Sequence, residues 1–214
     1  MEIDKNKPLP DHTRLDYCEC LAKLVLEELF PSQYCDLAVA DEPDLQGENV
    51  GIEVTIANDP KWQELLSNWV KANHCKNQKD YERRVEKMRE LGFEYTGGVQ
   101  VWPVFRPTFE FIRKAIEKKI EKLAKGEYKH FGRYELFIFT DTYFFNDITE
   151  EAKAYLFNGS VSDYYKTVYI LSEETELHIF DTEIGKYEII NIDCSEQAKR
   201  NFHARRIVEE AEYQ

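Results

Sequence analysis

Two acidic residues in the first quarter of the chain have the types and the spacing of metal ligands. Asp44 follows a proline in a turn-rich stretch, and eight residues separate it from Glu53, which lies in a run of alternating apolar residues. Carboxylate oxygens are the hard ligands that Mg²⁺ prefers, and one or two of them typically hold it. An ion bound in this way ionises a water near neutral pH and stabilises charge on a phosphoryl group. The two acids are therefore candidate ligands for a divalent cation that would assist hydrolysis.

The elements around these acids are expected to bring them together. Residues 50–57 predict a strand with a period of two, in which one face is apolar and the other, with Glu53, is small and polar. An alternating stretch at 35–39 predicts an earlier strand, and a polar, turn-rich loop follows it. We expect the two strands to form an antiparallel hairpin, which would carry Asp44 back over the polar face of the second strand.

The segment Pro43–Thr55 reads P-D, eight residues, then E-V-T, and a helix bearing Glu19 precedes it. This arrangement resembles the signature of the PD-(D/E)XK, or restriction-endonuclease-like, nuclease superfamily. The resemblance implies that Asp44 and Glu53 bind Mg²⁺ (or Mn²⁺) and that the backbone carbonyl of Val54 is a third ligand. It also implies that Glu19 orients a water or a second ion, and that the substrate is nucleic acid, DNA rather than RNA.

Within the resemblance, which covers about residues 14–57, the sequence departs from the pattern at Thr55. The family places a lysine there, which positions the attacking water and neutralises charge, whereas threonine offers only a hydroxyl. Some relatives take the lysine from a neighbouring helix. Lys119 is our candidate, because it projects about 60° from the centre of the apolar stripe of a predicted helix at 108–125. Lys122 is the second choice.

Each of these residues also has an interpretation without chemistry. Glu53 is then an exposed strand residue paired across to a lysine, and Asp44 is an ordinary turn residue. Glu19 becomes a residue at the rim of its helix, and Lys119 lays its aliphatic stem along apolar surface. In that case the chain is a catalytically inactive module of the same fold that binds a protein partner. An acidic immunity-type protein that neutralises a basic toxin would fit the formal net charge of -13.

Periodicity and turn residues divide the rest of the chain into helices and strands. Helices are predicted at 13–30, 60–73, 79–91, 108–125 and 195–212, and strands, besides the first two, at 136–139, 167–171, 176–180 and 187–192. The apolar run at 136–139 predicts a buried central strand. We therefore expect one α/β domain over residues 1–214, with a restriction-endonuclease-like mixed central sheet flanked by helices and a helical insertion after the second strand.

Composition indicates a cytoplasmic protein. The chain has 214 residues with 43% apolar residues, enough for one sizeable core, and no stretch approaches a membrane span. Its first residues are acidic and polar, unlike a signal peptide. Five scattered cysteines suit a reducing compartment better than a disulfide framework, and their spacing does not favour zinc.

The charge is distributed unevenly. Residues 71–89 hold seven Lys and Arg against three Asp and Glu, and residues 113–129 hold the same numbers. Such runs are most often solvated helix faces with pairs four residues apart, although they are also the groups that contact phosphates. Aromatic residues near them, Trp62, Trp69, Tyr81 and Trp102, either cover a core, which we favour, or stack on the bases of a single strand.

Overall fold

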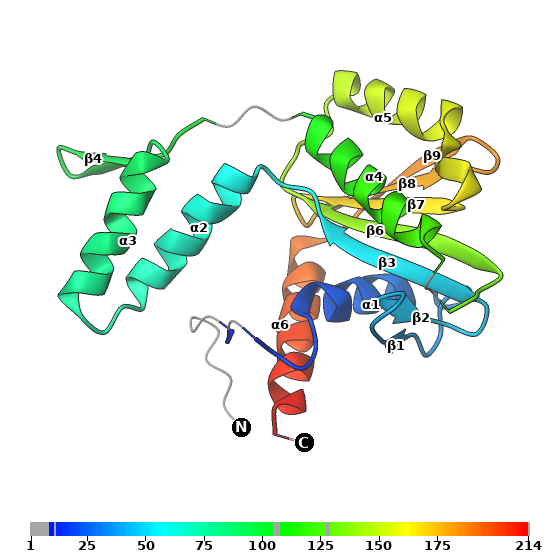
Figure 1. Ribbon diagram of the computed structural model, residues 1–214, viewed down its shortest axis with the longest axis horizontal. Coiled ribbons are helices and arrows are strands. Elements are labelled where there is room, and N and C mark those ends of the chain that lie inside the picture. The colour runs from blue at the N-terminus through cyan, green and yellow to red at the C-terminus, as the bar shows by residue number, and fades with distance from the viewer. Residues whose placement is uncertain (1–8, 11, 105–107, 127–128, 214) are drawn as a thin grey trace. The chain divides into compact units, whose positions relative to one another are not determined.

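The computed structural model describes residues 9–10, 12–104, 108–126 and 129–213 (Figure 1). The chain divides into two compact units. The sheet unit comprises residues 11–57 and 108–214, and the insertion unit comprises residues 1–10 and 58–107. No helix among the described residues is long and apolar enough to cross a bilayer. The expectation of a single domain over the whole chain stays a prediction.

The sheet unit is built on seven strands in the order β1-β2-β3-β6-β7-β8-β9. Their bounds are β1 Ala38–Val39, β2 Leu45–Gln46, β3 Val50–Ile56, β6 Arg133–Thr140, β7 Thr167–Ser172, β8 Glu176–Asp181 and β9 Lys186–Asn191. Only β3 with β6 and β6 with β7 pair in parallel, and the other neighbours are antiparallel. The sheet is therefore mixed, as the sequence predicted.

Helices cover both faces of this sheet. They are α1 (Tyr17–Leu29), α4 (Glu110–Ala124), α5 (Asn146–Asn158) and α6 (Cys194–Ala211), with a short 3₁₀ turn at Ser160–Asp163. In Figure 1, α4 and α5 lie on one face, and α1 and α6 lie on the other. The prediction of an α/β fold with flanking helices is confirmed.

The middle of the sheet forms the core. Leu136, Phe137 and Ile138 of β6 are fully buried, because β6 has a parallel neighbour on each side and helices above and below. On the α4 face, Leu136 and Ile138 share one apolar cluster with Ile112 and Ile116 of α4. The site residues described below are attached to this rigid centre.

The insertion unit contains a helical hairpin followed by a small β-hairpin. Helices α2 (Pro60–Asn73) and α3 (Gln78–Glu90) follow β3 directly, which places helices where the sequence predicted an insertion. Strands β4 (Glu94–Thr96) and β5 (Val99–Val101) then pair antiparallel. The two residues between them, Gly97 and Gly98, have φ of 62° and 83°, which suits the tight turn of a two-residue hairpin.

Several expectations about the elements were wrong. The first strand does not pair with β3, because β2 lies between them and bonds to both. Both faces of β3 are buried from Val50 to Val54, so the face that carries Glu53 is not an open polar face. Helix α1 begins at Tyr17 and not near residue 13, since the Asp16 side chain accepts hydrogen bonds from two backbone N–H groups and caps it there. Helix α5 was not predicted.

Candidate catalytic site beside the third strand

Asp44 reaches β3 because the chain before β2 passes very close to it. Residue 51 must be small, since a Cβ on Gly51 would lie 2.6 Å from Cγ of Pro43. Asp44, which follows Pro43 in the chain, accepts a hydrogen bond at Oδ2 from the backbone N–H of Val54 at 2.6 Å. The loop acid is therefore attached to the middle of β3, one residue from Glu53.

Glu53 is the more deeply buried member of the pair. Its residue is 0% exposed, and β3 places it opposite Leu136 of the central strand. Its Oε2 accepts a hydrogen bond from Lys119 at 2.5 Å. Its other oxygen, Oε1, is buried and has no hydrogen-bond partner among the described residues. An unpaired carboxylate oxygen in this environment is costly, and it is a position at which a donor or a cation would be favourable.

Lys119 joins the two acids. Its Nζ lies 2.9 Å from Asp44 Oδ2 and 2.5 Å from Glu53 Oε2. Lys119 reaches this position because Ile116 and Ile112, one and two turns earlier, anchor α4 in the core against β6. The predicted approach of Lys119 to the face of β3 is confirmed as geometry. Lys122, the second choice, instead lies 3.4 Å from Glu42 at the surface.

The electrostatics keep Lys119 charged. Burial by itself lowers the pKa of the ammonium, but attraction to Glu53 and Asp44, together with hydrogen bonds to both, outweighs it and raises the pKa above its ordinary value. An ammonium with a raised pKa cannot serve as a proton acceptor near neutral pH. Its chemical contribution is a fixed positive charge with hydrogen-bond donors.

Glu19 contributes to the same electrostatic environment from the first turn of α1. Burial, followed by repulsion from Asp44 and Asp16, raises the pKa of Glu19 to about 7, and Lys119 offsets part of this rise. Its carboxyl group is therefore divided between the protonated and ionised forms near neutral pH. A group of this kind is able to take up or release a proton, or to ionise fully when a cation arrives.

Val54 and Thr55 complete the motif on β3. In an extended strand the N–H and C=O of one residue point to the same edge, so the Val54 carbonyl faces the edge where its N–H meets Asp44. Thr55 is half-buried, and its backbone pairs with Ile138. Its hydroxyl adds no charge, so the positive charge near β3 comes from Lys119.

The donor set fits a small divalent cation. Among the described residues, no group of three or more His, Cys, Asp and Glu side chains is arranged to hold a metal ion. Mg²⁺, however, usually keeps several waters and takes only one or two carboxylates. Asp44 and Glu53 supply these carboxylates, the Val54 carbonyl supplies a further hard oxygen, and Glu53 Oε1 has a vacant coordination direction. The residues thus fit Mg²⁺ and give no ligand set for zinc.

The sequence analysis missed a second buried acid. Glu135 of β6 is 1% exposed, and its carboxylate accepts a hydrogen bond from Tyr34, whose hydroxyl lies 2.6 Å from that of Tyr169. Arg133 Nε lies 3.0 Å from its other oxygen. Burial raises the pKa of Glu135, and these partners oppose the rise. Because Glu135 pairs with Ile52, it lies on the face opposite Glu53 and belongs to a separate cluster.

Comparison with protein-family models, with curated proteins and with solved structures gave no match to this chain. The assignment of the site therefore depends on the geometry of Asp44, Glu53 and Lys119 and on the chemistry of their side chains.

Proposed function

We propose that this chain is a Mg²⁺-dependent nuclease of the PD-(D/E)XK type that hydrolyses phosphodiester bonds of DNA. One observation carries the proposal. The Lys119 ammonium, which comes from a helix far along the chain, lies within hydrogen-bond distance of both motif acids, Asp44 before β2 and Glu53 on β3. It supplies the positive charge that the motif requires and that Thr55 lacks.

Each residue then has a defined task. Asp44, Glu53 and the Val54 carbonyl hold Mg²⁺ (or Mn²⁺), which when bound supplies Lewis-acid stabilisation and a water of lowered pKa. Lys119 places its charge and donors beside the scissile phosphate, where negative charge develops. Glu19, with its pKa near 7, orients a water and accepts its proton. Thr55 offers a hydroxyl on the same strand, without charge.

A cleavage assay combined with calorimetry tests this proposal. We expect Mg²⁺-dependent nicking of supercoiled plasmid, and loss of nicking in Asp44→Asn and Glu53→Gln with the fold retained in circular dichroism. Lys119→Ala should reduce the rate by about 10²-fold or more, because one transition-state donor is removed, while Mg²⁺ affinity measured by calorimetry changes far less. Lys114→Ala is the matched control, since Lys114 lies on the same helix but pairs with Glu110 at the surface. Undiminished nicking in both acid variants would rule out the proposed site.

A second candidate function is a catalytically inactive module of the same fold that binds a protein. The observation that favours it is the ion pair itself, because the Lys119 ammonium already pairs with both Asp44 and Glu53 and offsets one of their two negative charges. The charge of -13 would then serve a basic partner, such as a toxin that the protein neutralises. Mg²⁺ binding without cleavage in the same assay would favour this alternative. Both functions suit the cytoplasm, where the five free cysteines stay reduced.

A further inference from the structure

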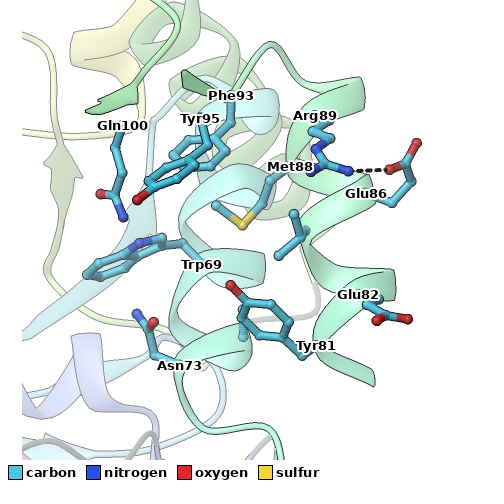
Figure 2. A pocket seen from close by; sticks show the side chains of 12 residues that line it. Trp69, Asn73, Tyr81, Glu82, Glu86, Met88, Arg89, Phe93, Tyr95 and Gln100 are labelled. Carbon is cyan, nitrogen blue, oxygen red and sulfur yellow. Dashed lines mark hydrogen bonds and ion pairs between the residues drawn. The ribbon is translucent and has the colours of Figure 1, made fainter. Parts of the chain in front are cut away.

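The insertion unit contains a pocket of about 490 Å³ that has no part in the proposed hydrolysis. Helices α2 and α3 and the hairpin of β4 and β5 line it, and Figure 2 shows the side chains that face it. Its volume falls within the range of about 300–1,000 Å³ that is typical of small-molecule sites. All of its lining residues belong to the insertion unit, so its shape is defined within that unit alone.

Aromatic rings dominate the lining and remain accessible. Trp69 is 36% exposed, Tyr81 is 45% exposed and Tyr95 is 64% exposed, although rings of this size are usually covered. Trp69 is held in place by an edge contact with Trp102 at 5.8 Å between ring centroids. Within the described part of the chain, Tyr81 and Tyr95 have no ring partner, so the face of each ring is available to a ligand in the pocket.

Two carboxamides border the indole of Trp69. Figure 2 shows Asn73 and Gln100 on either side of this ring, with their amide groups at the pocket. Both side chains are exposed, and neither makes a hydrogen bond to another described residue. A carboxamide both donates and accepts, which is what the edge of a nucleobase requires. A ring to stack on, flanked by two free amides, matches a planar heteroaromatic ligand with polar edges.

The surrounding charge favours an anionic ligand over a cationic one. Residues 71–89 supply eight of the twelve lining residues and hold seven Lys and Arg against three Asp and Glu, in a chain whose net charge is -13. The two lining acids already have partners, since Glu82 accepts from Gln78 at 2.9 Å and Glu86 lies 3.2 Å from Arg89. Arg83, Arg84 and Arg89 have side-chain partners of their own, whereas Lys76, Lys79 and Lys87 form no ion pair with another described residue, so these three charges of the segment are available to phosphates.

We propose that this pocket binds an unpaired nucleobase of a single-stranded nucleic acid, with Trp69 and Tyr81 as stacking faces and Asn73 and Gln100 as hydrogen-bonding groups for the edge of the base. This proposal rests on the proposed function only in taking nucleic acid as the class of ligand. It requires neither a metal ion nor cleavage. Stacking of this type tolerates any base sequence, because every base has a π face.

The test measures binding to the full chain in EDTA, so that no cleavage interferes. The probe is a labelled single-stranded DNA of about 12 nucleotides, long enough to span one such binding site. Anisotropy reports affinity, and quenching of tryptophan fluorescence reports the insertion unit, because Trp62, Trp69 and Trp102 all lie there. We expect Trp69→Ala and Tyr81→Ala each to weaken binding by about tenfold. Tyr143→Ala, which removes a tyrosine of similar exposure from the sheet unit, should bind as the wild type does.

Three further probes define the ligand. An abasic strand of the same length and a duplex should both bind more weakly than the single strand, and a mononucleotide should bind more weakly still. Equal affinity for the abasic strand, or unchanged binding in both aromatic variants, would overturn the proposal. A mononucleotide that binds as tightly as the strand would overturn the assignment to a polymer. Saturable binding of choline that is lost in Trp69→Ala, with no binding of the strand, would assign the pocket to a cation instead.

The outcome is independent of the catalytic proposal. Glu53→Gln should lose cleavage in Mg²⁺ and keep wild-type affinity for the strand in EDTA. Binding that requires the aromatic residues, in a wild type that never cleaves, would leave the pocket assigned and end only the nuclease proposal. If the wild type cleaves DNA but Trp69→Ala and Tyr81→Ala bind the strand normally, the nuclease proposal stands and the pocket proposal fails.

Discussion

At the scale of single residues, the Lys119 ammonium lies against two acids from other parts of the chain, Asp44 and Glu53. The spacing of Asp44 and Glu53 and the helical projection of Lys119 placed three side chains that the structure brings into direct contact. Periodicity did not reveal how deeply Glu53 is buried, because alternation assigns a residue to a face and does not say what covers that face. The cover here is α4, which joins β3 from residues more than fifty positions away.

The burial of Glu53 leads to a prediction about stability. Lys119→Ala should lower the free energy of unfolding by about 3–5 kcal/mol at pH 8, because it leaves a buried carboxylate without its cation. Glu53→Gln added to Lys119→Ala should recover much of this loss, since the remaining group is then neutral. Urea unfolding of the wild type, both single variants and the double variant measures the coupling.

Two controls make this cycle specific. Lys114→Ala should have little effect, since Lys114 is 63% exposed and its partner is at the surface. Mg²⁺ should stabilise Lys119→Ala more than it stabilises the wild type, because the ion replaces the missing charge and binds only the folded state. If Lys119→Ala unfolds at the same urea concentration as Lys114→Ala, the ion pair contributes nothing to the fold.

At the scale of elements, most of the long periodic segments were predicted, whereas strand β2 and helix α5 were missed. The two-residue strand β2 was missed because two residues show no period, and its presence changed the predicted hairpin into a three-strand edge. Helix α5 was missed although Ile148, Ala152 and Leu156 recur every four residues and are all buried. Aromatic and acidic residues between them hid this pattern.

Strand β3 needs a residue without a side chain at position 51, because Pro43, the neighbour of Asp44, lies directly against it. Gly51→Ala should destabilise the protein by about 1–3 kcal/mol, because the new methyl group overpacks a site bounded by Pro43, Phe131 and Tyr134 at 2.6, 3.0 and 3.1 Å. The displaced Pro43 should carry Asp44 away from the Val54 N–H and weaken Mg²⁺ binding. Thermal unfolding and calorimetry measure the two effects.

The double variant Gly51→Ala/Pro43→Ala provides the control for this clash. Removing Cγ of Pro43 relieves the shortest of the three contacts, so part of the lost stability should return. An unchanged melting temperature in Gly51→Ala alone would mean that the Pro43 segment yields at no cost, and that glycine is not required for the approach.

At the scale of the whole molecule, patterns in the sequence predicted the class of fold but not the division into two units. Composition and length describe an average over the chain, whereas the division depends on which apolar residues pack together. The insertion unit has its own small core of Leu65, Met88 and Phe93, with Trp62, Leu91 and Trp102 packed against it. The sheet unit buries a far larger apolar cluster around β6. Sequence patterns do not distinguish one core from two when both units contain similar helices.

The difference in core size leads to a prediction about unfolding. All three tryptophans belong to the insertion unit, so tryptophan fluorescence follows that unit alone. Circular dichroism in the helix band at ~222 nm follows the helices of both units. We expect the fluorescence transition at lower urea and with a smaller m-value, because a unit of this size buries little apolar surface and exposes little on unfolding. Met88→Ala should shift mainly the fluorescence transition and Ile116→Ala mainly the later one, each by about 2–5 kcal/mol, since the two side chains fill different cores. Coincident transitions that shift together in both variants would show instead that the chain unfolds as one cooperative domain, as its sequence predicted.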